Sequence, residues 1–203
     1  MAGSEPIAEP TGDPGRAVTS GRQTQRDRRE AIVREHMASE NVHDFDTTIA
    51  TFGHPRYELI ATGEVYDGEA EVRGYYADSR TAFPDQRNEV LELHHADDAV
   101  IVEFLLLGTH LGPLRALPPT GRSFRCRMSA VFLFDGDRLV NERVYFDQAT
   151  ILRQLGLARD PASLLGRLAL ALGHPLTIAR AFARSRRERR TRDRSRAAAR
   201  AWR

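Results

Sequence analysis

Asp147 is the residue of this sequence best placed to do acid–base chemistry. It follows Tyr145 and Phe146 at the end of a predicted strand, 138–146, and precedes an amphipathic stretch, 148–155, typical of a short helix. A carboxylate at the end of a largely apolar sheet face can transfer protons, and burial would raise its pKa. Asp is also a favoured helix N-cap, and a cap hydrogen bond would lower the same pKa. Both roles stay open, and the direction of the pKa shift distinguishes them.

The preceding strand predicts which side chains share a face with Asp147. Apolar residues alternate along 122–134, and Asp135-Gly136 indicates a tight turn into the returning strand. With these two residues as the loop, Asp147 lies opposite Phe124 and the odd-numbered residues of the returning strand face the apolar row. The predicted pocket around Asp147 is therefore lined by Asn141, Arg143, Tyr145 and Met128.

Histidines supply the other candidates. His54 and Tyr57 are predicted to line the pocket, with a loop-anchoring pair as the favoured alternative, and His36 is interpreted as a histidine at the edge of the core. His94-His95 and Asp97-Asp98 do not predict a metal site, because adjacent strand residues point to opposite faces. The single cysteine, Cys126, lies on the apolar face of a predicted strand, which favours inert burial.

The predicted secondary structure begins with helices and continues with a run of strands. Helical spacing is found over 26–39, 43–55 and 68–83, whereas strand patterns are found over 57–65, 88–95, 99–110, 122–134 and 138–146. This order predicts an α+β domain over residues 26–156, with helices packed on one face of an antiparallel sheet. Residues 1–25, rich in Gly, Pro, Ser and charge, are predicted to be disordered.

The C-terminal extension, 157–203, differs in composition and charge. It contains a predicted Leu/Ala-rich helix, 163–172, and a second helix that runs from about residue 176 into an Arg-rich end. Residues 180–203 carry a net charge of +9, which leaves −7 for the rest of the chain. An anionic surface is the candidate partner of this tail, against a solvated helix without a partner; specific nucleic-acid binding is not expected, because aromatic residues are sparse. Lacking a signal pattern or a long apolar run, the chain is expected to be cytoplasmic.

Several motifs carry a resemblance to a known family. Phe83-Pro84-Asp85, Gly108-Thr109-His110, Pro119-Thr120-Gly121-Arg122, and Asp147 followed nine residues later by Gly156 occur in this order. With them, residues 26–156 resemble the SnoaL-like polyketide cyclases, also called ester cyclases, of the NTF2-like superfamily. The resemblance implies a cone in which three N-terminal helices close over a curved sheet, with a small-molecule pocket between them.

The resemblance also implies a function. Asp147 matches the aspartate that serves these cyclases as the general acid/base of an intramolecular aldol closure, which uses neither metal nor cofactor. The expected protein is thus a cofactor-free enzyme of polyketide-type metabolism, a homodimer, acting on a hydrophobic carbonyl compound, with Tyr145 or Arg143 steadying the oxyanion. Two alternatives stay open: a non-catalytic protein that binds a lipid or polyketide-like ligand, and an interaction module.

Overall fold

The computed structural model describes the backbone of residues 14–201 and the side chains of 21–189 and 191. The chain divides into two units, the first ending at Leu155 and the second beginning at Gly156. This boundary coincides with the predicted end of the family-like domain. In the part of the chain that the structure describes, no helix is long and apolar enough to cross a membrane.

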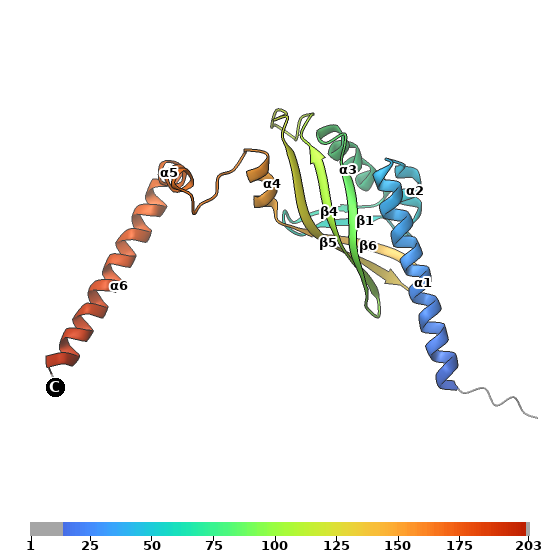
Figure 1. Cartoon of the computed structure of the whole chain (residues 1–203), viewed down its shortest axis with the longest axis horizontal. Helices are drawn as coiled ribbons and strands as arrows, with labels where there is room; N and C mark the ends of the chain where they lie inside the picture. The colour runs from blue at the N-terminus through green and yellow to red at the C-terminus, as the bar shows by residue number, and fades with distance from the viewer. Residues whose placement is uncertain (1–13, 202–203) are drawn as a thin grey trace, which may run out of the picture. The chain divides into compact units, whose positions relative to one another are not determined.

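The first unit is built on one curved, open sheet (Figure 1). Its six strands are β1 (Arg56–Leu59), β2 (Glu64–Asp67), β3 (Arg87–His95), β4 (Ala99–Thr109), β5 (Ser123–Asp135) and β6 (Arg138–Phe146), in the spatial order β2-β1-β6-β5-β4-β3. All neighbours pair antiparallel except β1 and β6, which are parallel. The run of long antiparallel strands confirms the α+β class.

Helices α1 (Pro14–Asn41), α2 (Phe45–Ala50) and α3 (Glu69–Ala82) precede these strands or lie between the first of them. Their apolar residues join one core with the even-numbered side chains of β5. Val33 and Met37 come from α1, and Val72 and Tyr76 from α3. The fourth helix, α4 (Gln148–Gln154), follows β6 directly and contributes Ile151 to the edge of this core.

Three predicted elements are corrected by the structure. Residues 14–25, predicted as disordered, belong to α1, which begins with Pro14 at a position where its missing N–H costs nothing; residues 1–13 lie outside the described part. The second helix ends at Ala50 rather than near Pro55, because Phe52 forms a bridge to Leu139 of β6. The predicted strand 57–65 is a hairpin of β1 and β2, with Gly63 in the turn at φ 72°.

The register of the β5–β6 hairpin also differs from the prediction. Asp135 pairs with Arg138, so the loop is Gly136-Asp137, and a bulge between Leu133 and Phe134 leaves Val140 as an extra residue. Because side chains alternate along a strand, the bulge exchanges the two faces of β6 beyond it. Glu142, Val144 and Phe146 therefore share the inner face with Met128, Ala130 and Phe132. Asn141, Arg143 and Tyr145, predicted on that face, lie on the opposite one.

The second unit contains α5 (Leu164–Gly173) and α6 (Pro175–Ala201). Ser163 caps α5, its Oγ accepting the Gly166 N–H at 3.0 Å. Most leucines of α5 face solvent; Leu164 is 82% and Leu172 75% exposed. The predicted pair of helices in the extension is present, and its apolar side chains find little cover within the unit.

Candidate functional site

A partly enclosed cavity of about 690 Å³ lies in the first unit. Its walls come from α1, α3, α4, all six strands, and the loop that follows β4. The loop is held against the end of α3, since the N–H groups of Leu111 and Gly112 both donate to the Ala82 carbonyl. Apolar side chains form most of the wall, among them Leu59, Phe83, Phe104, Leu106, Phe124, Met128 and Val144.

Glu142 brings a carboxyl group into this apolar wall. Only 3% of the residue is exposed, and Oε2 lies 3.1 Å from Nε2 of His36, a residue with no exposed surface. This separation fits an ion pair, yet Oε2 has no partner in hydrogen-bonding geometry among the described residues. The contact with His36 is therefore an ion pair with poor hydrogen-bond geometry, in which the two groups lie close enough to exchange a proton.

The proton affinities of the two groups rise together. Burial raises the pKa of Glu142, and the negative charge of Glu40 adds to this effect, whereas His36 opposes it. Burial also disfavours a charged His36, but its contacts with Glu142 outweigh that effect and raise the His36 pKa. A carboxyl group and an imidazole that both hold a proton more firmly than usual form a pair able to share one.

A chain of hydrogen bonds fixes the orientation of His36. The Thr51 hydroxyl donates to the Thr48 carbonyl at 2.6 Å, so it accepts from Nδ1–H of His36, 2.8 Å away. Nδ1 thus carries a proton and Nε2 faces Glu142. His36 itself does not line the cavity. It stands behind the carboxyl group, where it can position Glu142 and exchange a proton with it.

Tyrosines surround the same carboxyl group. Tyr57 and Tyr75 line the cavity, and their rings stack with centroids 4.8 Å apart. Burial raises the pKa of both, well above the ordinary range for Tyr57. Their hydroxyls therefore stay protonated at neutral pH, and a protonated phenol can donate a hydrogen bond to an oxyanion.

A second polar group lies in the cavity wall on α1 and β3. Asn88 donates from Nδ2 to Oε2 of Glu40 at 2.7 Å, while its own Oδ1 is buried and has no partner among the described residues. Gln86, beside it on the cavity wall, accepts from the Ser79 hydroxyl at 2.8 Å. An orphaned amide oxygen in a cavity wall is a ready acceptor for a ligand hydroxyl.

Asp147 lies elsewhere, at the exposed end of β6, and caps α4. Its Oδ1 accepts the Thr150 N–H at 3.0 Å, and its Oδ2 accepts the Thr150 hydroxyl. These bonds lower the pKa of Asp147. The direction is that of the helix cap, opposite to the shift expected of a buried acid/base. The carboxyl group lines a separate, shallow depression. Met128 and Phe146 are the only residues that line both this depression and the cavity.

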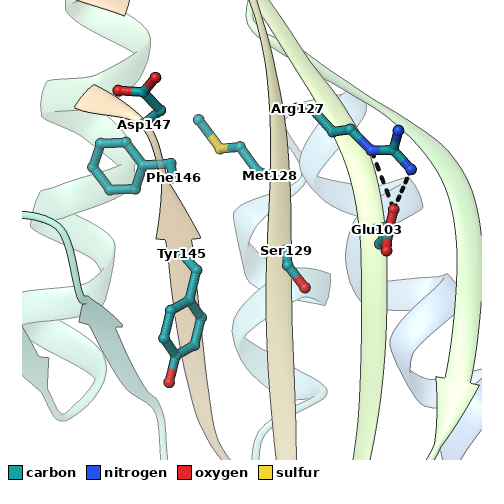
Figure 2. A pocket seen from close by; sticks show the side chains of 7 residues that line it. All are labelled: Glu103, Arg127, Met128, Ser129, Tyr145, Phe146 and Asp147. Carbon is teal, nitrogen blue, oxygen red and sulfur yellow. Dashed lines mark hydrogen bonds and ion pairs between the residues drawn. The ribbon is translucent and has the colours of Figure 1, made fainter. Parts of the chain in front are cut away.

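The depression also contains Tyr145 and a surface ion pair, Arg127–Glu103 (Figure 2). Figure 2 shows Asp147 at the end of β6, with Tyr145 before it on the same strand. Tyr145 is 44% exposed. Arg143, on the same outer face, donates to Glu58 of β1 at 3.2 Å. The structure thus places both predicted pocket residues outside the cavity, as a consequence of the bulge in β6.

The remaining predicted residues divide between the cavity and the surface. Tyr57 and Met128 line the cavity. His54 is exposed and pairs with Asp67, Nε2 to Oδ1 at 2.6 Å, which is the loop-anchoring arrangement. Cys126 is buried, and burial raises its thiol pKa. His94 and His95 lie beside Glu92 and Glu30, and among the described residues no three His, Cys, Asp or Glu side chains gather in a metal-binding group.

Sequence interpretation missed Glu142, His36 and Glu40, although a signal for the helix was present. Val33, His36, Met37 and Glu40 are spaced i, i+3, i+4 and i+7, so two ionisable residues stand on the apolar stripe of α1. On β6, Glu142 alternates with Val144 and Phe146. A carboxylate in phase with apolar residues on two facing elements indicates a buried polar site.

Comparison with solved structures places the first unit among NTF2-like folds. A putative SnoaL-like polyketide cyclase from Jannaschia sp. CCS1 superposes with a TM-score of 0.60 at 17% identity, covering 66% of this chain and 94% of that one. IdmH, a putative polyketide cyclase from Streptomyces antibioticus, gives 0.55 at 23%, covering 63% and 98%. TsrD from Streptomyces laurentii gives 0.57 at 20%, covering 65% and 97%. At these identities the likeness establishes the fold.

The family is established by the sequence itself. The model of the SnoaL-like polyketide cyclase family matches residues 30–155. The chain belongs to this family, as the motifs between Phe83 and Gly156 predict. A search among curated proteins found no match.

Proposed function

We propose that the protein is a cofactor-free cyclase or isomerase in which Glu142, rather than Asp147, transfers the proton. The observation that carries this proposal is the buried Glu142 carboxyl group in the wall of a partly enclosed cavity, backed by His36. A carboxylate whose pKa is raised toward neutrality is a stronger base than an exposed one and still ionises at working pH. Membership of the SnoaL-like family supports the class of reaction.

The reaction would begin with removal of a proton next to a carbonyl group. Glu142 takes the proton, and the carbon–hydrogen electron pair forms an enolate whose oxygen accepts hydrogen bonds from Tyr57 and Tyr75. The enolate carbon then attacks a second carbonyl of the same molecule and forms the carbon–carbon bond of the ring. The new alkoxide takes the proton back from Glu142, so the cycle needs no external acid, base or oxidant.

The cavity supports a hydrophobic substrate with few polar groups. Its volume lies within the range of small-molecule sites, roughly 300–1,000 Å³. A substrate that displaces water from this apolar wall would strengthen the electrostatic contacts of its enolate. The free Oδ1 of Asn88 favours a substrate that carries a hydroxyl group at that end.

Deuterium exchange tests the proposal without knowledge of the natural substrate. A panel of hydrophobic ketones and 1,3-diketones is incubated with the protein in D2O, and loss of the α-proton signal is followed by NMR. Glu142→Gln keeps the shape of the side chain and should slow exchange by about 10²- to 10⁴-fold, the usual contribution of a general base. Asp147→Asn is the matched control, because Asn also caps a helix, and should leave exchange unchanged.

The result decides between the two carboxylates and the non-catalytic alternative. Loss of exchange in Asp147→Asn, with Glu142→Gln active, would return the catalytic role to Asp147. A wild type that binds members of the panel but exchanges no proton would favour the alternative, a lipid- or polyketide-binding protein with Glu142 as a hydrogen-bonding anchor. This experiment does not test the expected homodimer or the alternative of an interaction module, which stay predictions.

A further inference from the structure

The C-terminal unit carries an apolar surface that its own two helices leave uncovered. Leu164, Leu165, Leu168 and Leu172 are spaced i, i+1, i+4 and i+8, so they lie within one arc of α5. Each is more than half exposed. Across the Gly173-His174-Pro175 break, the first turns of α6 continue with Leu176 and Phe182, 70% and 63% exposed. A helix with so many exposed leucines is typical of a surface that binds a membrane or another protein.

Positive charge follows this apolar segment directly. Among the side chains of α6 that the structure describes, five arginines are exposed: Arg180, Arg184, Arg186, Arg187 and Arg189. Among the described side chains, none of these five has an acidic partner in an ion pair. Sequence alone shows that the charge continues, since residues 180–203 hold 11 Arg against Glu188 and Asp193. The unit therefore presents an apolar block followed by a cationic block along two consecutive helices.

We propose that this unit docks on the surface of an anionic lipid bilayer. Exposed leucines on α5 enter the interface between headgroups and acyl chains, and the arginines of α6 pair with lipid phosphates. Two signals of this kind, one apolar and one polybasic, are what stable attachment to a bilayer surface requires. The ten residues of α5 are about half of a membrane span, so the helix lies in the interface rather than across the bilayer.

Two competing partners explain only part of the unit. Nucleic acid would engage the arginines, but its phosphates give the leucines nothing to bury against. A second copy of the chain would cover the leucines. A symmetric contact of this kind would also bring the arginines of the two copies together, and their positive charges would repel each other. The bilayer satisfies both blocks at once, and residues 1–179, with a net charge of −7, would stay off the anionic surface.

Vesicle co-sedimentation with the full chain tests the proposal. Vesicles of equal parts phosphatidylglycerol and phosphatidylcholine are compared with pure phosphatidylcholine. The wild type should bind the anionic vesicles at least tenfold more tightly, since each Arg near an anionic surface contributes about fivefold. The triple variant Leu164→Gln, Leu168→Gln, Leu172→Gln should lose at least about tenfold in affinity, because three side chains no longer enter the bilayer.

The charge half of the proposal has its own variant and control. Changing Arg184, Arg186, Arg187 and Arg189 to Gln should lower affinity for anionic vesicles by at least about tenfold. Matched controls on the first unit change four exposed arginines (Arg22, Arg26, Arg122 and Arg125) or three exposed apolar residues (Val42, Leu91 and Leu111) to Gln. Both controls should bind the vesicles within about twofold of the wild type, since neither block of the second unit is altered.

Three results would overturn the proposal. Full vesicle binding by the leucine variant would reduce the contact to charge alone. Tight binding of duplex DNA that survives the leucine changes, without vesicle binding, would identify a nucleic-acid surface. A wild-type oligomer that the leucine variant converts to monomers, again without vesicle binding, would show that the leucines join copies of the chain.

Discussion

Glu142 lies within β6, and Asp147 follows the end of this strand five residues later. The surroundings of the two carboxylates differ in burial, in partners and in the direction of the pKa shift. Glu142 is 3% exposed, lines the cavity and faces His36. Asp147 has a side chain 58% exposed and is engaged with Thr150 at the start of α4. The pKa of the first is raised by burial, and the pKa of the second is lowered by hydrogen bonds.

The difference shows that position on a strand does not decide the proton affinity of a carboxylate. Hydrogen bonds from N–H and O–H donors stabilise the carboxylate of Asp147 and make it a weak base. Desolvation destabilises the carboxylate of Glu142 and makes it a stronger one. The largest effect expected is the loss of exchange in Glu142→Gln. Four further experiments test this contrast between the inner and outer sides of the β5–β6 hairpin.

Filling the cavity should have the largest of these effects. Met128→Trp places a bulky ring in the cavity wall, whereas Ser129→Trp, one residue along β5, places it on the outer face. The first should weaken binding of the neutral fluorophore Nile red by about 10- to 100-fold, the usual effect of overpacking a close-fitting site. The second should leave binding unchanged. Equal effects of both would mean that the probe binds at the shallow outer depression shown in Figure 2.

Replacing His36 should move the pH dependence of exchange. His36 favours the ionised form of Glu142, so His36→Asn should raise the Glu142 pKa further and move the ascending limb of the rate profile to higher pH. On the ascending limb the exchange rate should fall about tenfold for each pH unit by which this limb moves, and it should recover on the alkaline plateau. A lower plateau with an unmoved midpoint would assign His36 a purely structural role.

The two carboxylates should also impose opposite pH dependence on stability. The folded-state pKa of Glu142 lies above its ordinary value of 4.5, so its stabilising contribution is complete below that value and is lost as pH rises through the folded pKa. His36, raised above 6.5, has the same sign. Asp147 is depressed below 3.8, so its contribution is present above that value and is lost as pH falls through the folded pKa.

Melting curves at a series of pH values measure these signs. The melting temperature of the wild type should fall relative to that of Glu142→Gln as pH rises above 4.5 and through the folded-state pKa of Glu142. The advantage of the wild type over Asp147→Asn should shrink below about pH 4. Slopes of the same sign for both variants would contradict the assignment of one carboxylate to the cavity and the other to the helix cap.

Sequence pattern predicted most of the fold, because long strands and amphipathic helices have clear periods. The strand predicted as 138–146 has those bounds in β6, and the helix predicted over 68–83 differs from α3 by one residue at each end. The face of β6 was wrong for a local reason. The turn lies one residue later than Asp135-Gly136, and the unpaired Val140 then reverses the alternation.

The bulge at Val140 turns Glu142 toward the cavity, so the sequence did not predict Glu142 as a site residue. Glu142 is in phase with Val144 and Phe146, but it stands in a run of three polar residues, 141–143, in which the predicted turn favours the opposite face. The Glu142–His36 contact joins residues more than a hundred positions apart and follows from the packing of α1 on the sheet. Tyr57 and Met128, which stand on regular strands, were predicted at the cavity, and the structure places both there.

The smallest effect expected is that of removing the α4 cap, and it isolates the structural role of Asp147. Asp147→Ala deletes the acceptor for the Thr150 N–H and should lower the melting temperature by less than about 4 °C, the scale of one exposed cap in a chain of this length. Asp147→Asn retains an acceptor and should recover most of this loss at neutral pH. Both variants should exchange ketone α-protons at the wild-type rate, because the carboxyl group does not line the cavity. Ile151 and Leu152 of α4 line the cavity. A modest loss of Nile red affinity in Asp147→Ala that Asp147→Asn restores would therefore show that the cap affects the cavity by stabilising α4. A loss of exchange in Asp147→Asn that leaves its melting temperature intact would instead require the carboxylate itself, and the contrast with Glu142 would fail.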